Sequence, residues 1–461
     1  MNPAKPPFDP DALYQRALSL HHMGQLDEAE VLYRRLLSFF PNQPEVLATL
    51  GTLSAQQGRH EEGIRQFEQS LKISPRQPIA LYNLGAELQK LSRLEEALAC
   101  YDKAIALHST DVDMHLNRGN TLKDLGRHDE ALASYDRAIA LQPACAAAYW
   151  NKGLINIFTG NFEPGWQLYE WGWNCGERGT PRNFPRPRWL GEQPIDGKTL
   201  LIHAEQGLGD AIQFCRYAPM VAALAARVVL EVPAPLVALL STLEGDILVV
   251  QNGSALPDFD LYCPVMSLPL AFKTTISTIP AGIPYLHADP AKQRFWQERL
   301  GRKTRPRVGL AWSGSATHKN DHHRSIPLHM LEPLLQLPLE FHSLMKEIRP
   351  GDAPDASRLD QIHFHRELLH DFSDTAALAS EMDLVISVDT SVAHLAGALG
   401  KPVWVLLPFA PDYRWMANRS DTPWYPGATL FRQPAIGDWC GVIDEAAQQL
   451  KAKFLFAGDE K

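Results

Sequence analysis

The stretch GQLDEA at residues 24–29 recurs along the first third of the chain at a constant spacing of 34 residues. Its later copies read GRHEEG at 58–63, SRLEEA at 92–97, GRHDEA at 126–131 and GNFEPG at 160–165. A ring follows each copy at the same period, at Tyr33, Phe67, Tyr101, Tyr135 and Tyr169. Self-similarity at a fixed period of about 20–50 residues indicates stacked supersecondary units. This stretch therefore decides the fold of the N-terminal third.

The other columns of the repeat indicate paired helices. Small residues recur where two helices would touch, glycine opens the turn, and Pro41, Pro75 and Pro143 follow the second helix as stop signals. The pattern resembles the tetratricopeptide repeat (TPR) and predicts five copies at 10–43, 44–77, 78–111, 112–145 and 146–179. The fifth copy contains Pro164 and several tryptophans, which is typical of a terminal repeat that caps the stack or docks onto another domain.

One polar column invites a functional interpretation. Asn83, Asn117 and Asn151 occupy the same position of the first helix in successive repeats, on the face that would line the concave groove. Side-chain amides offer donors and an acceptor, so such a ladder can hold an extended peptide backbone. The alternative is that each amide bonds a neighbouring repeat.

From about residue 198, short apolar runs alternate with helical stretches, as in parallel sheets with crossover helices. The predicted fold class is an α-solenoid of tetratricopeptide repeats followed by an α/β GT-B fold of two Rossmann-like domains. The predicted division is 10–179 repeats, 180–197 linker, 198–300 first Rossmann-like domain, 301–434 second Rossmann-like domain and 435–461 helical tail.

Composition and charge exclude several classes of protein. The 461 residues are 45% hydrophobic and 21% charged, with a formal net charge of −9, which is ordinary for a globular protein and argues against a nucleic-acid partner. The sequence shows no apolar run of membrane-spanning length and no signal-peptide pattern, so we expect a cytoplasmic protein. Its six cysteines form no C-x-x-C pair, so we expect neither disulfides nor a zinc site.

The loop Glu205-Gln-Gly-Leu-Gly-Asp210 follows a predicted strand and opens a helix. Gly207 and Gly209 would let the backbone approach a ligand. Asp210 is either a general base toward an acceptor hydroxyl or a helix-capping residue. His203, at the end of the strand, is a second candidate base.

A second loop, residues 312–327, carries what a diphosphate needs. Ser313 supplies a hydroxyl, and Lys319 and Arg324 supply fixed positive charge. Its histidines, His318, His322 and His323, lack a carboxylate or thiolate at a familiar metal-binding spacing. We therefore predict no metal and no cofactor.

A third loop follows the apolar run that ends at Val388. Asp389 is placed to bind a sugar hydroxyl, and Thr390 or Ser391 would cap a helix whose N-terminus favours an anion. His394 lies on the first turn of that helix. The alternative is that Asp389 and His394 only satisfy local backbone groups.

Three segments, EQGLGDAIQFCRY (205–217), WSGSATHKNDHHRSIPL (312–328) and DLVISVDTSVAHLAGALGKPVWVLLP (383–408), resemble glycosyltransferase family 9, the ADP-heptose:lipopolysaccharide heptosyltransferases. The resemblance implies that Asp210 is the base and that Asp389 contacts the sugar beside Thr390 and His394. Arg324 stands where that family has lysine, which keeps the charge but changes the hydrogen-bond geometry. An acidic residue that contacts the nucleoside falls near Glu347.

The repeat-plus-transferase plan is also similar to that of O-linked N-acetylglucosamine transferases and flagellin-modifying glycosyltransferases. The resemblance implies a metal-independent, inverting glycosyltransferase that moves a sugar from a nucleotide-diphosphate sugar to an acceptor. We expect that acceptor to be a protein hydroxyl presented by the repeat groove. The alternatives are a repeat scaffold with an inactive transferase-like domain, and a transferase acting on lipopolysaccharide or another glycan.

Overall fold

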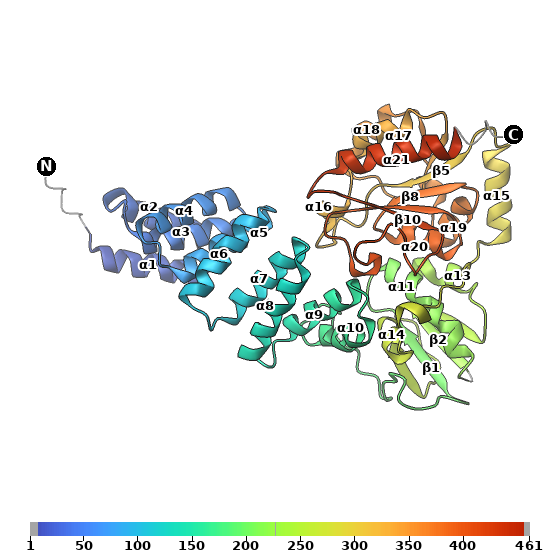
Figure 1. The fold of residues 1–461 in the computed structure, drawn as a ribbon, viewed down its shortest axis with the longest axis horizontal. Coiled ribbons are helices and arrows are strands. Elements are labelled where there is room, and N and C mark those ends of the chain that lie inside the picture. Colours follow the sequence, from blue (N-terminus) through green and yellow to red (C-terminus); the bar gives the residue numbers. More distant parts are fainter. Residues whose placement is uncertain (1–7, 226, 456–461) are drawn as a thin grey trace. The chain divides into compact units, whose positions relative to one another are not determined.

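The computed structural model describes residues 8–225 and 227–455. They fall into two compact units, Met1–Lys152 and Gly153–Lys461, and the division lies inside the fifth repeat. Figure 1 shows antiparallel helices in the first unit and two sheets in the second. Within the described residues no helix is long and apolar enough to cross a membrane.

Paired helices form the repeats. Each of the first four pairs joins a 13-residue helix to a 14-residue helix. The helices are α1 (Pro10–His22), α2 (Leu26–Phe39), α3 (Pro44–Gln56), α4 (His60–Ile73), α5 (Pro78–Lys90), α6 (Leu94–Leu107), α7 (Val112–Asp124), α8 (His128–Leu141), α9 (Ala146–Phe158) and α10 (Phe162–Tyr169). The predicted α-solenoid is confirmed.

The repeat columns have direct physical causes. The turn position needs a positive φ, and it has φ 76° at Gly24 and Gly58 and φ 59° at Ser92, a region that glycine enters without steric cost. The small residue lies under the ring: a Cβ on Gly119 would be 2.5 Å from the Tyr135 ring. These contacts explain why the sequence repeats every 34 residues.

The fifth repeat departs from the others. Its second helix, α10, has only eight residues and continues as a 3₁₀ turn, η1 (Glu170–Trp173). Trp166 and Tyr169 are buried there, and Trp166 contacts Phe214 and Tyr413 of the α/β region edge to face. The end of this repeat therefore packs onto the α/β region, as its composition predicts.

The first sheet has four parallel strands in the order β3-β2-β1-β4. Its strands are β1 (Thr199–His203), β2 (Arg227–Val232), β3 (Ile247–Gln251) and β4 (Leu261–Pro264), and its helices are α11 (Leu208–Phe214), α12 (Ala218–Ala222), α13 (Val237–Leu240) and α14 (Leu268–Ala271). The sequence predicts one helix from Gly207 through Ala226. The structure instead bends at a 3₁₀ turn and restarts before Pro219, because proline cannot donate inside a helix. Ala226 lies outside the described residues.

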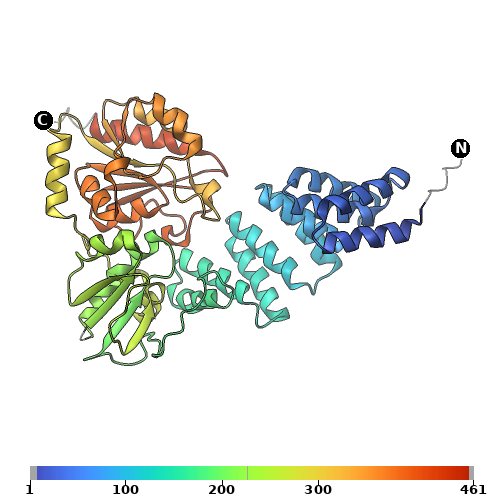
Figure 2. The ribbon, with the colours of Figure 1, turned by 180° about the vertical axis from the view of Figure 1, so that it is seen from behind.

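The second sheet has six parallel strands in the order β10-β9-β8-β5-β6-β7, and both sheets can be followed as arrows from behind in Figure 2. Its strands are β5 (Arg307–Ala311), β6 (Glu340–Ser343), β7 (Ile362–His363), β8 (Leu384–Val388), β9 (Val403–Leu407) and β10 (Ala428–Arg432). The helices after β4 are α15 (Pro290–Leu300), α16 (Asp321–Arg324), α17 (Glu332–Leu335), α18 (Ala353–Arg358), α19 (Phe372–Ser380), α20 (Ser391–Ala398) and α21 (Trp439–Phe454). These sheets confirm the predicted α/β class.

The segments predicted as a linker and as a helical tail both pack against the α/β region. In the predicted linker, Arg188 forms an isolated parallel bridge with Tyr262 of β4. The predicted tail forms α21, whose Trp439, Ile443 and Leu450 are buried in the core of the second sheet. A helix with such an apolar face is stable only against a partner.

Candidate functional site

Strand order locates the ligand edges of the two sheets. In open parallel sheets, ligands bind beyond the carboxyl ends of the strands where the strand order reverses. This point lies between β1 and β4 in the first sheet and between β5 and β8 in the second. All three loops singled out from the sequence leave one of these strands at its carboxyl end.

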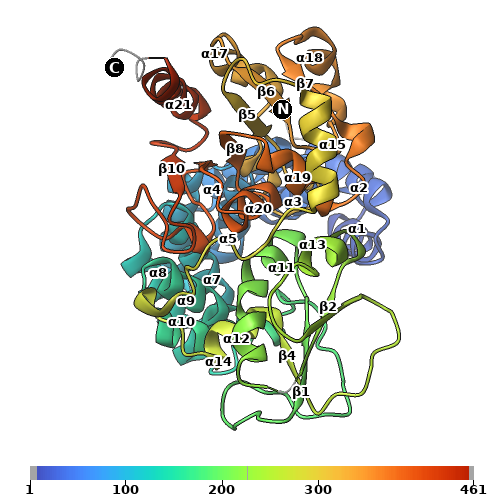
Figure 3. The same ribbon diagram turned by 90° about the vertical axis from the view of Figure 1, so that its right-hand side faces the viewer.

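The two ligand edges meet through α11 and α20, as Figure 3 shows. A Cβ on Gly209 would lie 2.9 Å from Cδ2 of His394 and 3.4 Å from Cα of Ser391. Gly209 is therefore needed for the close approach of these two helices, and the loops of Asp210 and Asp389 lie side by side.

Asp210 makes two contacts. Its Oδ2 accepts a hydrogen bond from the backbone N–H of Gly207 at 2.7 Å, and its Oδ1 pairs with the guanidinium of Arg414. The first contact is the helix-capping role that the sequence left open. The second brings a cation from the second sheet region to the candidate base.

Arg414 is a residue that sequence reasoning missed. It follows Tyr413 in a 3₁₀ turn, is 8% exposed, and also pairs with Asp412 at 2.7 Å. Its contact with Asp210 joins positions 204 residues apart. No local spacing reveals such a pair.

The loop after β8 holds a second carboxylate. Burial and the neighbouring Asp412 raise the pKa of Asp389 to about 6, although Arg324 and Arg414 lie near it. Thr390 takes the N-cap position of α20 without a side-chain capping bond, and Ser391 begins the helix. Nδ1 of His394 lies 3.0 Å from the hydroxyl of Tyr425, and its ring stacks on Trp415. Burial lowers the pKa of His394, so its imidazole is neutral.

The loop after β5 supplies the cations. Arg324 donates from Nη1 to the carbonyl of Asp389 at 2.9 Å, so it lies at the same edge. Lys319 is 79% exposed and pairs with Glu177 at 2.9 Å. Ser313 is buried, and its Oγ has no hydrogen-bond partner among the residues that the structure describes.

Glu347 and His203 lie in separate hollows. Glu347 lines a surface hollow of about 420 Å³ with Lys346, Ile348, Arg366 and Glu367. His203 lines a cavity of about 270 Å³ between η1 and β4 and packs against Phe184 and Tyr262. Burial lowers its pKa to about 3. The contacts that the structure records for His203 do not join it to Asp210.

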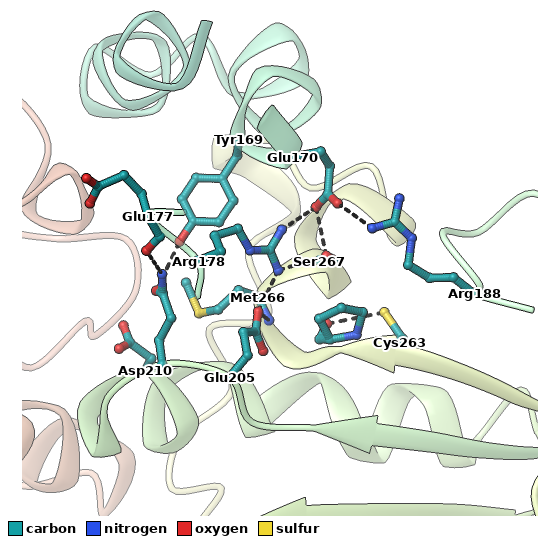
Figure 4. Close-up of polar contacts among 12 residues, drawn as sticks. Tyr169, Glu170, Glu177, Arg178, Arg188, Glu205, Asp210, Cys263, Met266 and Ser267 are labelled. Carbon is teal, nitrogen blue, oxygen red and sulfur yellow. Dashed lines mark hydrogen bonds and ion pairs between the residues drawn. The ribbon is translucent and has the colours of Figure 1, made fainter. Parts of the chain in front are cut away.

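A buried ion cluster supports the Asp210 loop from the fifth repeat. Arg178 lies between Glu170 of η1 and Glu205, which follows β1 (Figure 4). Sequence reasoning missed this cluster as well.

The asparagine column of the repeats makes bonds within the chain. Nδ2 of Asn83 donates to Thr52 at 3.3 Å, and Nδ2 of Asn117 donates to the hydroxyl of Tyr82 at 2.9 Å. Nδ2 of Asn151 donates to the carbonyl of Ala147 at 3.0 Å. The first two bonds join neighbouring repeats, the alternative that the sequence left open.

No group of three or more His, Cys, Asp or Glu side chains that could hold a metal ion occurs in the part of the chain that the structure describes. The rings of His322 and His323 lie close together, with centroids 3.8 Å apart and their planes tilted by 44°.

Family descriptions match both the repeat region and a segment of the α/β region. Residues 10–53, 44–77, 78–111 and 119–157 match tetratricopeptide repeats. Residues 370–411, which include Asp389 and α20, match glycosyltransferase family 9 (heptosyltransferase).

Three known proteins are similar to parts of the chain. Protein FlbA of Caulobacter vibrioides is 27% identical over 335 residues, which are 65% of this chain and 54% of FlbA. The chain thus spans about half the length of this relative. A structure of MamA has 23% identity and a TM-score of 0.33, covering 35% of this chain and 95% of MamA. A structure of YrrB, a TPR protein with an unusual peptide-binding site, has 22% identity and a TM-score of 0.34, covering 37% of this chain and 87% of YrrB.

The chain thus carries tetratricopeptide repeats in its N-terminal third, and residues 370–411 of its α/β region resemble glycosyltransferase family 9.

Proposed function

We propose that the protein is a cytoplasmic, inverting glycosyltransferase that needs no metal and takes a nucleotide-diphosphate sugar as donor. The observation that carries the proposal is the contact of Gly209 with His394 and Ser391. It joins a carboxylate loop on the first sheet to a cation-bearing ligand edge on the second. Two facing ligand edges suit a reaction between two substrates.

Each group has one task. Asp210 takes the proton of an acceptor hydroxyl, whose oxygen bonds to the anomeric carbon of the sugar as the bond from that carbon to the diphosphate breaks. Lys319, Arg324 and the N-terminus of α20 bind the leaving diphosphate. Asp389 orients the sugar, with Thr390, Ser391 and His394 shaping the site around it.

Two ion pairs would change during the reaction. Lys319 is held by Glu177 at the surface, and an exposed pair of this kind contributes little and exchanges readily. A donor diphosphate would compete with Glu177 for that ammonium group. Arg414 holds Asp210 in place until the acceptor arrives and takes one of its carboxylate oxygens.

The acceptor in this proposal is a protein hydroxyl, presented by a segment bound along the repeats. Asn83, Asn117 and Asn151 lie at matching positions there, and their amide oxygens would accept from a peptide backbone. Replacing all three with alanine should weaken binding of the acceptor by about tenfold or more. Unchanged binding would remove the asparagines from the proposal.

The reaction is tested first with donors. The full chain is incubated with UDP-, GDP-, ADP- and dTDP-linked sugars, and the unfolding midpoint and the release of nucleoside diphosphate are measured. At least one donor should raise the midpoint and be hydrolysed slowly. If no donor stabilises the protein, the scaffold alternative replaces the enzyme.

The base is tested with Asp210→Asn. Its turnover should fall by about 100-fold or more, which is the usual contribution of a general base. Asp258→Asn is the matched control, because Asp258 is an exposed aspartate of the first sheet region, and it should retain activity. Full turnover in Asp210→Asn would assign the proton transfer to another group.

A further inference from the structure

The side chain of Arg178, just after the last repeat helix, is buried between segments far apart in the sequence. Its Nη1 lies 2.6 Å from Oε1 of Glu170, and its Nη2 lies 2.5 Å from Oε1 of Glu205 and 3.0 Å from Oγ of Ser267. The side chain is 0% exposed. The guanidinium also stacks over Trp173, 4.3 Å from the ring centroid. Figure 4 shows it reaching from the repeat toward the end of β1.

The pairing of charges in this cluster is uneven. Glu170 has a second cation, Arg188, at 3.1 Å. Glu205 is 5% exposed, and Arg178 is the cation recorded against it. Its Oε2 has no partner among the described residues. A buried carboxylate is costly unless it is paired, so the position of Glu205 depends on Arg178.

Glu205 begins the loop that carries Asp210. Its Oε1 also accepts from the backbone N–H of Met266 at 3.2 Å, which ties the ends of β1 and β4 together. The next residue, Gln206, accepts from the hydroxyl of Tyr169 at 3.2 Å and donates to the carbonyl of Glu177 at 3.3 Å. Both residues at the start of the loop are therefore held by residues 169–178.

We propose that Arg178 is a positioning residue: through Glu205 it fixes the loop that presents Asp210 to the ligand edge of the second sheet. The end of the last repeat thus helps to position the loop that carries Asp210. The role of Asp210 rests on the proposed function, whereas the placement of the loop does not. Arginine suits this task because its planar fork donates to Glu170 and Glu205 with separate nitrogens, which a lysine cannot reproduce.

The placement is tested by hydrogen exchange on the full chain. The probes are the backbone amides of 205–211, among which Ala211 donates to the carbonyl of Gly207 at 3.2 Å. Arg178→Met should speed their exchange by about tenfold or more, because the loop opens locally. Arg178→Lys should give a smaller increase.

Arg307→Met is the matched control. Arg307 is also a buried arginine, 3% exposed and 3.2 Å from Glu340. It begins β5, so it lies at the amino end of that strand, away from the ligand edge. It should leave exchange at 205–211 unchanged. If Arg178→Met does not fold, Glu205→Ala, which leaves Arg178 paired with Glu170, tests the same loop. Wild-type exchange in the folded variant would overturn the proposal.

Kinetics with a donor that the wild type accepts test the catalytic consequence. Arg178→Met and Arg178→Lys should lower kcat, by up to about 100-fold for a base displaced by 1 Å. The donor KM should stay within about threefold, because the donor is bound by the second sheet. Faster exchange with unchanged kcat would overturn the positioning role. If the wild type turns over no donor, the proposed function fails while the exchange result still decides the placement of the loop.

Discussion

The repeats and the buried ion cluster around Arg178 both contain Arg–Glu pairs. The pairs of the repeats are exposed to solvent, whereas those of the cluster are buried. Arg93–Glu96 and Arg127–Glu130 lie on the surface of α6 and α8, with Glu96 58% exposed. Arg178 and Glu205 are almost completely enclosed. Surface pairs gain little because water and salt screen them, whereas a buried charge that loses its partner cannot return to water. The surface pairs therefore contribute little to stability, and the buried pairs fix one arrangement.

The largest expected effect comes from breaking the buried cluster. Arg178→Met leaves two carboxylates without their shared cation and should lower the free energy of unfolding by about 3–5 kcal/mol. Urea unfolding is followed by tryptophan fluorescence, which reports mainly the second unit because every tryptophan except Trp150 lies after Gly153, and by helical circular dichroism, which also reports the repeats. Arg127→Met is the matched surface variant. An equal loss in both variants would contradict the comparison.

An intermediate effect is expected in the pH dependence of stability. Burial raises the pKa of Glu205 to about 7 from an ordinary value of 4.5, although Arg178 opposes the shift. The folded protein therefore binds more protons than the unfolded chain between these values, and this stabilising contribution, complete below pH 4.5, is lost as the pH rises through 7.

Glu205→Gln removes that titration. The stability of the wild type should fall relative to the variant as the pH rises from 4.5 to 7, which unfolding midpoints across this range will show. Hydrogen bonds from Arg93 and Arg127 lower the pKa values of Glu96 and Glu130, so their contribution has the opposite sign and is lost as the pH falls. Parallel curves for the wild type and Glu205→Gln would show that Glu205 does not titrate in this range.

The smallest effect is expected at the repeat surface. Arg93→Ala and Arg127→Ala should leave the unfolding midpoint of the first unit unchanged within error, and adding salt should not alter that result. Circular dichroism at a helix wavelength measures it, because the first unit is helical. A clear loss of stability would mean that these pairs act as a network along the solenoid.

The fold was predictable because its signals are local and periodic. Gly24, Gly58 and Gly126 mark turns that require a positive φ, and the buried strands such as β8 are continuous apolar runs. Two strands, β7 and β10, are not predicted from the sequence because their apolar patterns are weaker. Strand β7 has only two residues, and β10 follows the proline-rich stretch TPWYPG. Short strands at a sheet edge owe their existence to their neighbours more than to their own sequence.

The site was predictable only where a loop follows a strong strand. Asp210 and Asp389 were predicted in this way, and the structure places their loops side by side. Arg178 and Arg414 were missed because their partners lie 27 and 204 residues away, and nothing in a single sequence marks such pairs. The tryptophans of the fifth repeat did indicate that it docks onto another domain. Composition does not identify Arg178 as the side chain that contacts Glu205.

The division at Lys152 and Gly153 has a consequence for how such chains change by recombination. Gaining or losing one 34-residue copy ahead of that point leaves every partner of Arg178 in place. The length of the solenoid can therefore vary by unequal crossing-over, and a crossover at residue 179 would instead separate Arg178 from Glu205. Chimaeras that exchange repeats should be joined before Gly153.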